Sequence, residues 1–356
     1  MIVARAPLRI SFAGGGTDLP AYSERFGGLV LSAAITPACH VRLAPWPGDG
    51  VLLDSADYGV TLAVARRQPI TIAEPLSLPR AVLAWFSARD LLPAGIRLEL
   101  QADVAPGSGL GSSSAMTVAM VTAIGHHLAL PLPPRRAAEI ACEIEIDLLG
   151  RPIGRQDQYA AAIGGINTLS FTPDGVNVDP LALPEDIHRR FADHLLLVST
   201  RRTRDSASVL RGQRAATGVD AEVTSRLHQL KELAVAMRGA LMAGDIRGFG
   251  ALLDEGWRLK RGLHHGVTSN EIDRWYALAR AAGAYGGKIA GAGGGGYFLF
   301  CVPPERHAAL VTRMRAAGLT PFPFALDPHG ATVSEAAVPA APAVHRAQVV
   351  MKGVPA

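Results

Sequence analysis

Apolar and polar positions alternate with a period of two in several short runs of the chain, a pattern typical of half-buried strands. The first run places Leu8, Ile10 and Phe12 on one face, with Arg9 and Ser11 on the other. Similar runs predict further strands at 28–35, 40–45, 51–53, 59–64, 96–100, 165–171, 195–200, 285–290, 297–302 and 320–325. Longer segments predict helices at 78–91, 112–130, 134–149, across most of 205–282, and at 304–317. This order of elements predicts an α+β protein in two lobes.

Two stretches without a regular pattern divide the chain. Residues 173–186 are rich in Pro and Asp, a composition that indicates a domain boundary. We therefore expect an N-terminal lobe at 1–185 and a C-terminal lobe at 186–335. Residues 336–356 are rich in Ala and Pro and have no hydrophobic period, so the sequence predicts a disordered tail there.

Composition places the protein among folded globular chains and narrows its partners. Hydrophobic residues make up 49% and charged residues 19% of the sequence. No apolar run is long enough for a membrane span, and Arg5 and Arg9 interrupt the region where a signal peptide would be apolar. We therefore expect a cytoplasmic protein without a membrane partner. The net charge is +4, but the arginines are scattered and do not interleave with aromatic residues, which argues against a nucleic-acid partner. The cysteines, which show no metal-binding spacing and are expected to be reduced and buried, are Cys39, Cys142 and Cys301.

The 38 glycines are unevenly spread and concentrate in three clusters. These clusters are 14–16, then Gly107 with Gly109 and Gly111, then 291–296 with only Ala292 interrupting. Each lies beside a predicted strand or helix, where the backbone must turn sharply or approach another group closely. One such loop can be an ordinary turn, but three in one chain favour a ligand site.

The second glycine cluster leads from a predicted strand into a predicted helix and reads PGSGLGSSSA at 106–115. Glycines allow successive backbone amides to point at an anion, and the start of the helix adds free N–H groups and the positive end of its dipole. Ser112, Ser113 and Ser114 could be simple helix caps, or could offer hydroxyls to a phosphate or to Mg²⁺. No lysine follows as in the GxxxxGK nucleotide loop, and the spacing differs from a GxGxxG dinucleotide turn. The segment therefore indicates a phosphate site of another family.

This segment resembles the signature of the GHMP small-molecule kinases, a superfamily that includes galactokinase, homoserine kinase and mevalonate kinase. Two further segments resemble its first and third motifs, and they read APLRISFAGGGTD at 6–18 and AGAGGGGYFLF at 290–300. The three motifs occur in the right order across nearly the whole chain. The resemblance implies the two-lobed GHMP kinase fold. In that fold a mixed α/β N-terminal lobe has a left-handed-crossover, ribosomal-protein-like core, and the C-terminal lobe is ferredoxin-like.

Longer runs narrow the resemblance to one branch of the superfamily. They read RAPLRISFAGGGTDLPAY at 5–22, IGRQDQYAAAIGGIN at 153–167 and GGKIAGAGGGGYFLF at 286–300. These runs are similar to the bacterial D-glycero-D-manno-heptose 7-phosphate kinases, whereas a galactokinase would show Gly-Glu-His-Thr-Asp in place of GGGTD at 14–18. The resemblance implies an ATP- and Mg²⁺-dependent kinase that phosphorylates the anomeric hydroxyl of the heptose 7-phosphate to give the 1,7-bisphosphate.

Asp157 is the candidate catalytic carboxylate. It lies at a loop-to-helix transition two positions after Arg155, which would keep the carboxyl ionised at neutral pH. In isolation the residue would be interpreted as a helix N-cap, but its QDQ context matches the catalytic aspartate of the superfamily. Arg9 matches the arginine of the first motif, which stabilises charge between donor phosphate and acceptor, since a guanidinium donates as a fork and stays protonated. Without that match, Arg9 would be interpreted as an exposed strand residue.

Helix geometry singles out Glu145, and the resemblance adds the nucleotide contacts. Glu145 falls on the apolar arc of its helix, where a carboxylate is costly unless it forms a salt bridge or binds a metal. The resemblance implies the metal role, with Ser113 as the second contact of Mg²⁺. The residues expected to bind ATP are Pro106, Gly107, Ser108, Gly109, Leu110, Gly111, Ser112, Ser113 and Ser114.

The first and third motifs imply the acceptor site. Asp18 occupies the position at which family members hold sugar hydroxyls, and the glycines before it would wrap the sugar ring. The basic cluster at 201–204 suits a distal phosphate, although arginines near the start of a helix are more often solvated. Lys288 is expected to be a solvated strand residue. The residues expected to bind the acceptor are Gly14, Gly15, Gly16, Thr17, Asp18, Arg204, Gly293 and Gly294.

Two alternatives stay open for the function. The acceptor could be another sugar such as L-fucose, for which no basic cluster is needed. The protein could also be a sensor of this fold that binds nucleotide and sugar without turnover. The expected partners are ATP and a small sugar phosphate, and the sequence leaves open whether the chain forms a homodimer.

Overall fold

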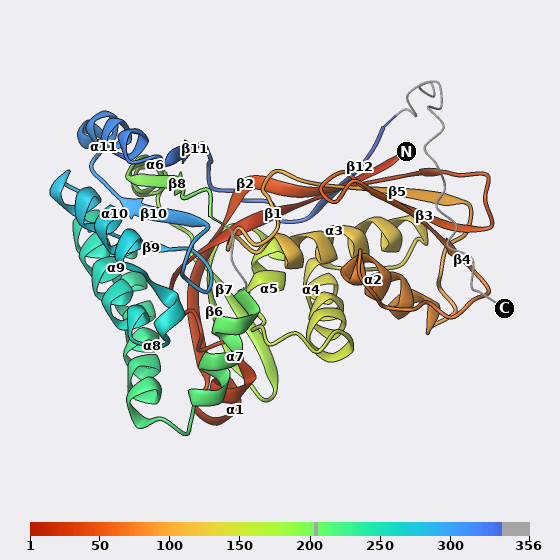
Figure 1. The fold of residues 1–356 in the computed structure, drawn as a ribbon, viewed down its shortest axis with the longest axis horizontal. Coiled ribbons are helices and arrows are strands. Elements are labelled where there is room, and N and C mark those ends of the chain that lie inside the picture. The colour runs from red at the N-terminus through yellow and green to blue at the C-terminus, as the bar shows by residue number, and fades with distance from the viewer. Residues whose placement is uncertain (203–205, 337–356) are drawn as a thin grey trace.

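The computed structural model describes residues 1–202 and 206–336 (Figure 1). The predicted phosphate contact Arg204 and the predicted disordered tail, apart from Ala336, lie outside the described residues. The described chain builds two β-sheets with helices packed on them, which agrees with the predicted α+β class.

The larger sheet is organised by two long antiparallel strands, β1 (Ile2–Ala13) and β2 (Gly28–Pro45). The strand order is β12-β1-β2-β5-β3-β4, and β6 pairs with the first part of β2 and with β7. β3 and β5 run parallel, whereas the other pairs are antiparallel. The remaining strands are β3 (Gly50–Ser55), β4 (Val60–Ala65), β5 (Ile96–Ala102), β6 (Ile166–Thr172), β7 (Gly175–Pro180) and β12 (Thr332–Glu335).

β2 is one strand where the sequence predicted two, at 28–35 and 40–45. Pro37 lies between the two predicted parts and has no N–H to donate. It sits at a register shift opposite Pro7 and Leu8, where the pairing of β1 and β2 is already interrupted. The strand therefore continues through the proline without leaving a lost hydrogen bond.

A layer of helices covers one face of the large sheet (Figure 1). It contains α2 (Ser77–Ser87), α3 (Ser112–His127), α4 (Pro134–Cys142) and α5 (Gln156–Ile163). α3 is buried on nearly all sides, which explains why its sequence is apolar all round. The helix predicted at 134–149 is α-helical only to Cys142 and continues as a wider π-helical segment, Glu143–Leu148. Such segments are rare and are frequent at functional sites.

The second lobe contains a four-stranded antiparallel sheet with the order β11-β8-β10-β9. Its strands are β8 (Leu195–Ser199), β9 (Gly286–Ile289), β10 (Tyr297–Cys301) and β11 (Thr320–Phe322). In chain order this is fourth-first-third-second, with helices between the first and second strands and between the third and fourth. This split βαβ arrangement confirms the predicted ferredoxin-like lobe. The other helices are α1 (Pro20–Phe26), α6 (Glu185–Asp193), α7 (Ser206–Ala216), α8 (Ala221–Met242), α9 (Ile246–Arg261), α10 (Asn270–Ala281) and α11 (Pro304–Ala316).

The end of the described chain returns to the large sheet. β12 pairs with β1, and the backbone of Ala336 donates to the carbonyl of Met1 at 2.9 Å. The strand at 332–335 therefore lies with the N-terminal strands, whereas the sequence grouped it with the C-terminal lobe at 186–335. The sequence did not predict this strand, because its residues are mostly polar and exposed.

An aromatic cluster joins the two lobes beside the strand that carries Arg9. Phe12 of β1 contacts Phe191 and Phe249, with ring centroids 5.5 and 5.4 Å apart and edge-to-face geometry. Phe191 and Phe249 come from α6 and α9, and their own centroids are 4.8 Å apart. This packing sets the position of β1 against the second lobe, where both sheets approach the candidate site.

The cysteines are buried and free of disulfides, as predicted. Within the described residues, none of the helices combines the length and the apolar character that a membrane crossing needs.

Candidate active site

The glycine loop before α3 has the conformation of an anion site. Gly107, Gly109 and Gly111 all have positive φ angles, of 77°, 79° and 78°, which L side chains rarely adopt. A Cβ on Gly109 would lie 2.8 Å from the carbonyl oxygen of Ala290, so a neighbouring loop also requires glycine there. No side chain caps the start of α3 among the described residues, so its first amides remain available to a phosphate.

The third glycine cluster packs directly on this loop. A Cβ on Gly291 would lie 2.6 Å from the carbonyl oxygen of Gly109, and one on Gly296 would collide with the carbonyl of Ser108. Gly293 and Gly294 contact Val267 instead, and the amide of Gly294 donates to its carbonyl at 2.6 Å. The structure therefore places Gly293 and Gly294 against a turn of the second lobe, and neither lines the cavity beside Asp18 that is described below.

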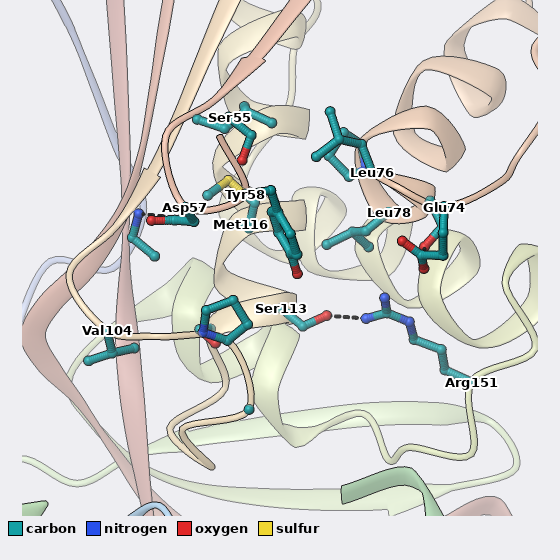
Figure 2. A pocket seen from close by; sticks show the side chains of 17 residues that line it. Ser55, Asp57, Tyr58, Glu74, Leu76, Leu78, Val104, Ser113, Met116 and Arg151 are labelled. Atoms are coloured by element: carbon teal, nitrogen blue, oxygen red, sulfur yellow. Dashed lines mark hydrogen bonds between the residues drawn. The ribbon is translucent and has the colours of Figure 1, made fainter. Parts of the chain in front are cut away.

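A cavity of about 250 Å³ lies beside the loop, under β3 and α2 (Figure 2). Leu76, Leu78 and Met116 give its walls apolar surface, with Glu74 and Asp57 nearby, and Tyr58 lies between the two sides. At the near end Ser113 and Arg151 point toward one another next to the phosphate loop. Apolar walls that lead to a phosphate site suit a nucleotide. The sequence missed these apolar wall residues because ordinary leucines, methionines and tyrosines carry no motif.

Arg9 and Asp157 form a bidentate ion pair between the phosphate loop and a second cavity. Arg9 Nε and Nη2 donate to the two carboxylate oxygens of Asp157 at 2.7 and 2.6 Å. Arg9 Nη1 donates to the carbonyl of Gly109 at 2.7 Å, so the arginine also holds the phosphate loop. The sequence expected Arg155 to be the partner of Asp157, but Arg155 donates to the carbonyl of Thr172. Asp157 lies in the first turn of α5, and its side chain is 22% exposed toward the cavity.

Asp18 is a buried carboxylate on the wall of the second cavity, which we call the acceptor cavity. Its oxygens accept from the backbone amides of Gly16 at 3.0 Å and Gln156 at 3.3 Å. Burial raises the pKa of Asp18, and the negative charge of Asp157 raises that pKa further. Gly15 and Gly16 also line the cavity, whereas Gly14 and Thr17 hold the turn. The hydroxyl of Thr17 donates to the carbonyl of Gly14 at 2.8 Å and is fully buried.

The second lobe closes the acceptor cavity. Leu210 and Gln213 of α7, Lys260 of α9 and the backbone at Gly291 complete its wall. Lys260 is only 7% exposed and its ammonium donates to the carbonyl of Gly291. The sequence did not single out Gln213 or Lys260, since neither belongs to a recognisable motif.

Glu145 and Ser113 lie together beside the phosphate loop. Glu145 is fully buried in the π-helical segment, and the Ser113 hydroxyl donates to its Oε1 at 2.5 Å. Gln158 Nε2 donates to its other oxygen at 2.8 Å. Arg151 donates to both Ser113 and Glu145, so the salt bridge that the sequence left open is present as well.

The donor set at Glu145 suits Mg²⁺. No group of three or more His, Cys, Asp or Glu side chains gathers as a metal site anywhere in residues 1–202 and 206–336. One carboxylate and one hydroxyl beside a phosphate loop suit Mg²⁺, which takes most of its ligands from water and from nucleotide phosphates. A buried carboxylate with a nearby hydroxyl is therefore compatible with the predicted metal role.

One lysine differs from what the sequence suggested. The prediction that Lys288 is solvated is wrong, because this residue is buried where the edge strand β9 faces β1. The ammonium of Lys288 donates to the carbonyls of Ser11 at 2.6 Å and Phe12 at 3.2 Å. Burial lowers the pKa of Lys288 well below its usual value, and the positive charges of Lys260 and Arg9 lower it further.

The described arginines of the basic cluster are engaged elsewhere. Arg201 Nε donates to the Thr320 hydroxyl at 2.8 Å, and Arg202 pairs with Glu271 at 2.7 Å. Both are exposed, and neither belongs to the acceptor cavity. Of this cluster only Arg204, which lies outside the described residues, stays a predicted phosphate contact.

Comparison with known proteins decides the family. The GHMP kinases N terminal domain matches residues 78–165, and the GHMP kinases C terminal domain matches residues 237–318. The chain is 32% identical to a D-glycero-alpha-D-manno-heptose 7-phosphate kinase of Campylobacter jejuni, over 88% of this chain and 93% of that protein. The chain belongs to the GHMP kinases. As a GHMP kinase it is a phosphotransferase that uses ATP as donor and an alcohol group as acceptor.

Other relatives of this GHMP kinase differ in the acceptor that their names state. A solved D-glycero-D-manno-heptose 1-phosphate kinase of Bacteroides thetaiotaomicron has a TM-score of 0.80 and 27% identity, and the match covers 95% of this chain and 100% of that one. An L-fucokinase/L-fucose-1-P guanylyltransferase of Bacteroides fragilis is 29% identical over 91% of this chain, which spans 37% of that longer protein.

Proposed function

We propose that this GHMP kinase transfers the γ-phosphoryl group of ATP to the anomeric hydroxyl of D-glycero-D-manno-heptose 7-phosphate, giving the 1,7-bisphosphate. The observation that carries the proposal is the Arg9–Asp157 pair, which faces the acceptor cavity while Arg9 holds the phosphate loop. The similarity over almost the full length of the heptose 7-phosphate kinase of Campylobacter jejuni supports this acceptor.

In this mechanism Asp157 orients the anomeric hydroxyl and accepts its proton as the oxygen attacks the γ-phosphorus. The bond from that phosphorus to the bridging oxygen of ADP breaks, and ADP leaves. The guanidinium of Arg9 holds both carboxylate oxygens of Asp157 in place and offsets the negative charge that builds up between donor and acceptor. Backbone amides at 107–114 hold the phosphates of the nucleotide.

We further propose Mg²⁺ as the metal of this kinase, held by Glu145 and Ser113. When bound, Mg²⁺ neutralises negative charge on the phosphates of the nucleotide. Without it, the positive charge of Arg151 compensates the buried carboxylate of Glu145. Gln158 holds the second oxygen of Glu145 and so fixes the direction in which that carboxylate points.

L-fucose is the second candidate acceptor. The similarity to the L-fucokinase of Bacteroides fragilis favours it. Arg201 and Arg202 also favour it, because they contact other groups and add no positive charge to the acceptor cavity. Lys260 favours the heptose phosphate, since it brings a positive charge to the acceptor cavity. A sensor without turnover is disfavoured, because Arg9, Asp157 and Glu145 are all present and paired.

An acceptor panel tests the proposal. ADP release is measured with D-glycero-D-manno-heptose 7-phosphate, the unphosphorylated heptose, L-fucose and galactose, and phosphorus NMR locates the new phosphate. We expect the highest kcat/KM with the heptose 7-phosphate and an acid-labile phosphate at the anomeric carbon. Turnover of L-fucose without any sugar phosphate would overturn the assignment in favour of the second candidate. Sugar binding without ADP release would favour the sensor.

A further inference from the structure

Three side-chain atoms at the acceptor cavity are buried and have no hydrogen-bond partner in the described part of the chain. They are Ser11 Oγ, Gln156 Oε1 and Gln213 Nε2. Their side chains belong to residues that are only 5%, 8% and 5% exposed. A buried polar atom without a partner destabilises the fold, so three of them in one cavity require an explanation.

Each of the three side chains is held in place by its surroundings. Ser11 lies two positions after Arg9 on β1, and Lys288 binds its carbonyl at 2.6 Å. The amide of Gln156 donates to Asp18, and the Gln156 side chain also hydrogen-bonds that carboxyl, which lowers the pKa of Asp18 against the effect of burial. The unpaired oxygen of Gln156 is thereby left for another group.

Gln213 is brought to the cavity by the second lobe. It lies on α7, and its side-chain nitrogen rests against Gly16, where an added Cβ would collide with it. Gly16 has a φ of 102°, so both its backbone conformation and its neighbour require glycine at this position. The contact shows why the glycine loop and α7 must be close for the cavity to form.

The three atoms are chemically complementary. Gln213 Nε2 is a donor, Gln156 Oε1 is an acceptor, and the Ser11 hydroxyl can be either. Asp18 adds a buried carboxylate to the same cavity. A simple alcohol would satisfy only one or two of these groups besides Asp157, whereas a ligand with several neighbouring hydroxyls can satisfy all of them.

We propose that Ser11, Gln156 and Gln213 bind non-reacting hydroxyls of a polyhydroxylated acceptor and thereby determine which sugar is phosphorylated. This inference rests on the proposed sugar-kinase function and adds the residues that select the substrate. Gln213 contributes from the second lobe, so selection of the sugar depends on how the two lobes meet. The three residues position the acceptor, while Asp157 and Arg9 carry out the chemistry.

Substitutions that remove the unpaired atoms test the inference. Ser11→Ala and Gln213→Met keep approximate size, so the midpoint of thermal unfolding should stay unchanged or rise. The KM for the acceptor should rise about 10- to 100-fold in each, from the loss of one hydrogen bond to a buried group. The KM for ATP should not change. Gln229→Met, at an exposed position on α8, is the matched control and should leave both values as in the wild type.

Monodeoxy analogues of the acceptor identify the bonded hydroxyls. One analogue should lack the hydroxyl that Gln213 binds. With this analogue, kcat/KM of the wild type should fall by about as much as kcat/KM of Gln213→Met falls with the full sugar. Because the hydrogen bond is already absent in Gln213→Met, this variant should lose little further kcat/KM with the same analogue. Unchanged acceptor KM in both variants, or a parallel rise in both KM values with a lower unfolding midpoint, overturns the inference while the proposed function stands. If the wild type phosphorylates no sugar at all, the proposed function falls and this inference falls with it.

Discussion

Replacing Asp157 by Asn probes the pair at the centre of the active site. Asn keeps one oxygen for Arg9 Nε, but its NH₂ group then faces Arg9 Nη2, which donates to the carboxylate at 2.6 Å in the native pair. The Arg9 side chain is only 6% exposed, so water cannot restore the lost bond. Loss of one hydrogen bond to a charged group lowers the free energy of unfolding by about 1.5–3 kcal/mol.

The effect on catalysis is expected to be larger than the effect on stability. Asn cannot accept the proton of the acceptor hydroxyl, and a positioned general base contributes about 10²- to 10⁴-fold to the rate. This corresponds to roughly 3–5 kcal/mol of activation free energy. The KM for ATP should change little, because Arg9 still holds the phosphate loop through the carbonyl of Gly109 at 2.7 Å.

Steady-state ADP release at saturating ATP and acceptor measures kcat, and urea unfolding measures stability. Asp174→Asn, at an exposed turn of the same lobe, is the matched control and should resemble the wild type in both assays. A near-normal kcat for Asp157→Asn would refute the role of Asp157 as base. A loss of kcat that is accompanied by an equal loss of ATP binding would instead assign the pair to shaping the phosphate loop.

Three further changes probe the surrounding groups. Glu145→Gln should weaken binding of ADP with Mg²⁺ but not of ADP alone in calorimetry, and equal weakening of both would argue against a metal role. The folded pKa of Asp18 is raised above 3.8, so its stabilising contribution is complete below that pH and is lost as the pH rises through the raised pKa. The midpoint of thermal unfolding of the wild type should therefore fall relative to that of Asp18→Asn as the pH rises above 3.8. A difference between the two midpoints that does not change with pH would contradict the raised pKa. Lys288→Met leaves the carbonyls of Ser11 and Phe12 without their donor and should lower the free energy of unfolding by about 1–3 kcal/mol in urea titration. Wild-type stability of Lys288→Met would show that the lysine does not hold β1.

The sequence alone determined the features that depend on neighbouring residues. The loop at 106–115 could be predicted because three glycines followed by serines force a turn and open a helix within ten residues. The burial of Glu145 followed from the period of its helix, although the segment is π-helical in the structure. Asp157 was found through its short motif, and Ser113 through its place in the loop. In each case the signal lies within one or two turns of chain, because local spacing sets backbone conformation.

Only the tertiary structure decided which distant groups meet. Asp157 pairs with Arg9, 148 positions away, rather than with the nearby Arg155. Lys288 is buried because an edge strand of the second sheet packs against β1, and Gln213 reaches the acceptor cavity because α7 lies over the glycine loop. The spacing of residues along the chain cannot predict such contacts, because they depend on how the two lobes pack together. The sequence therefore indicated the phosphate site and its chemistry, whereas the packing of the lobes determines the wall that would select the acceptor.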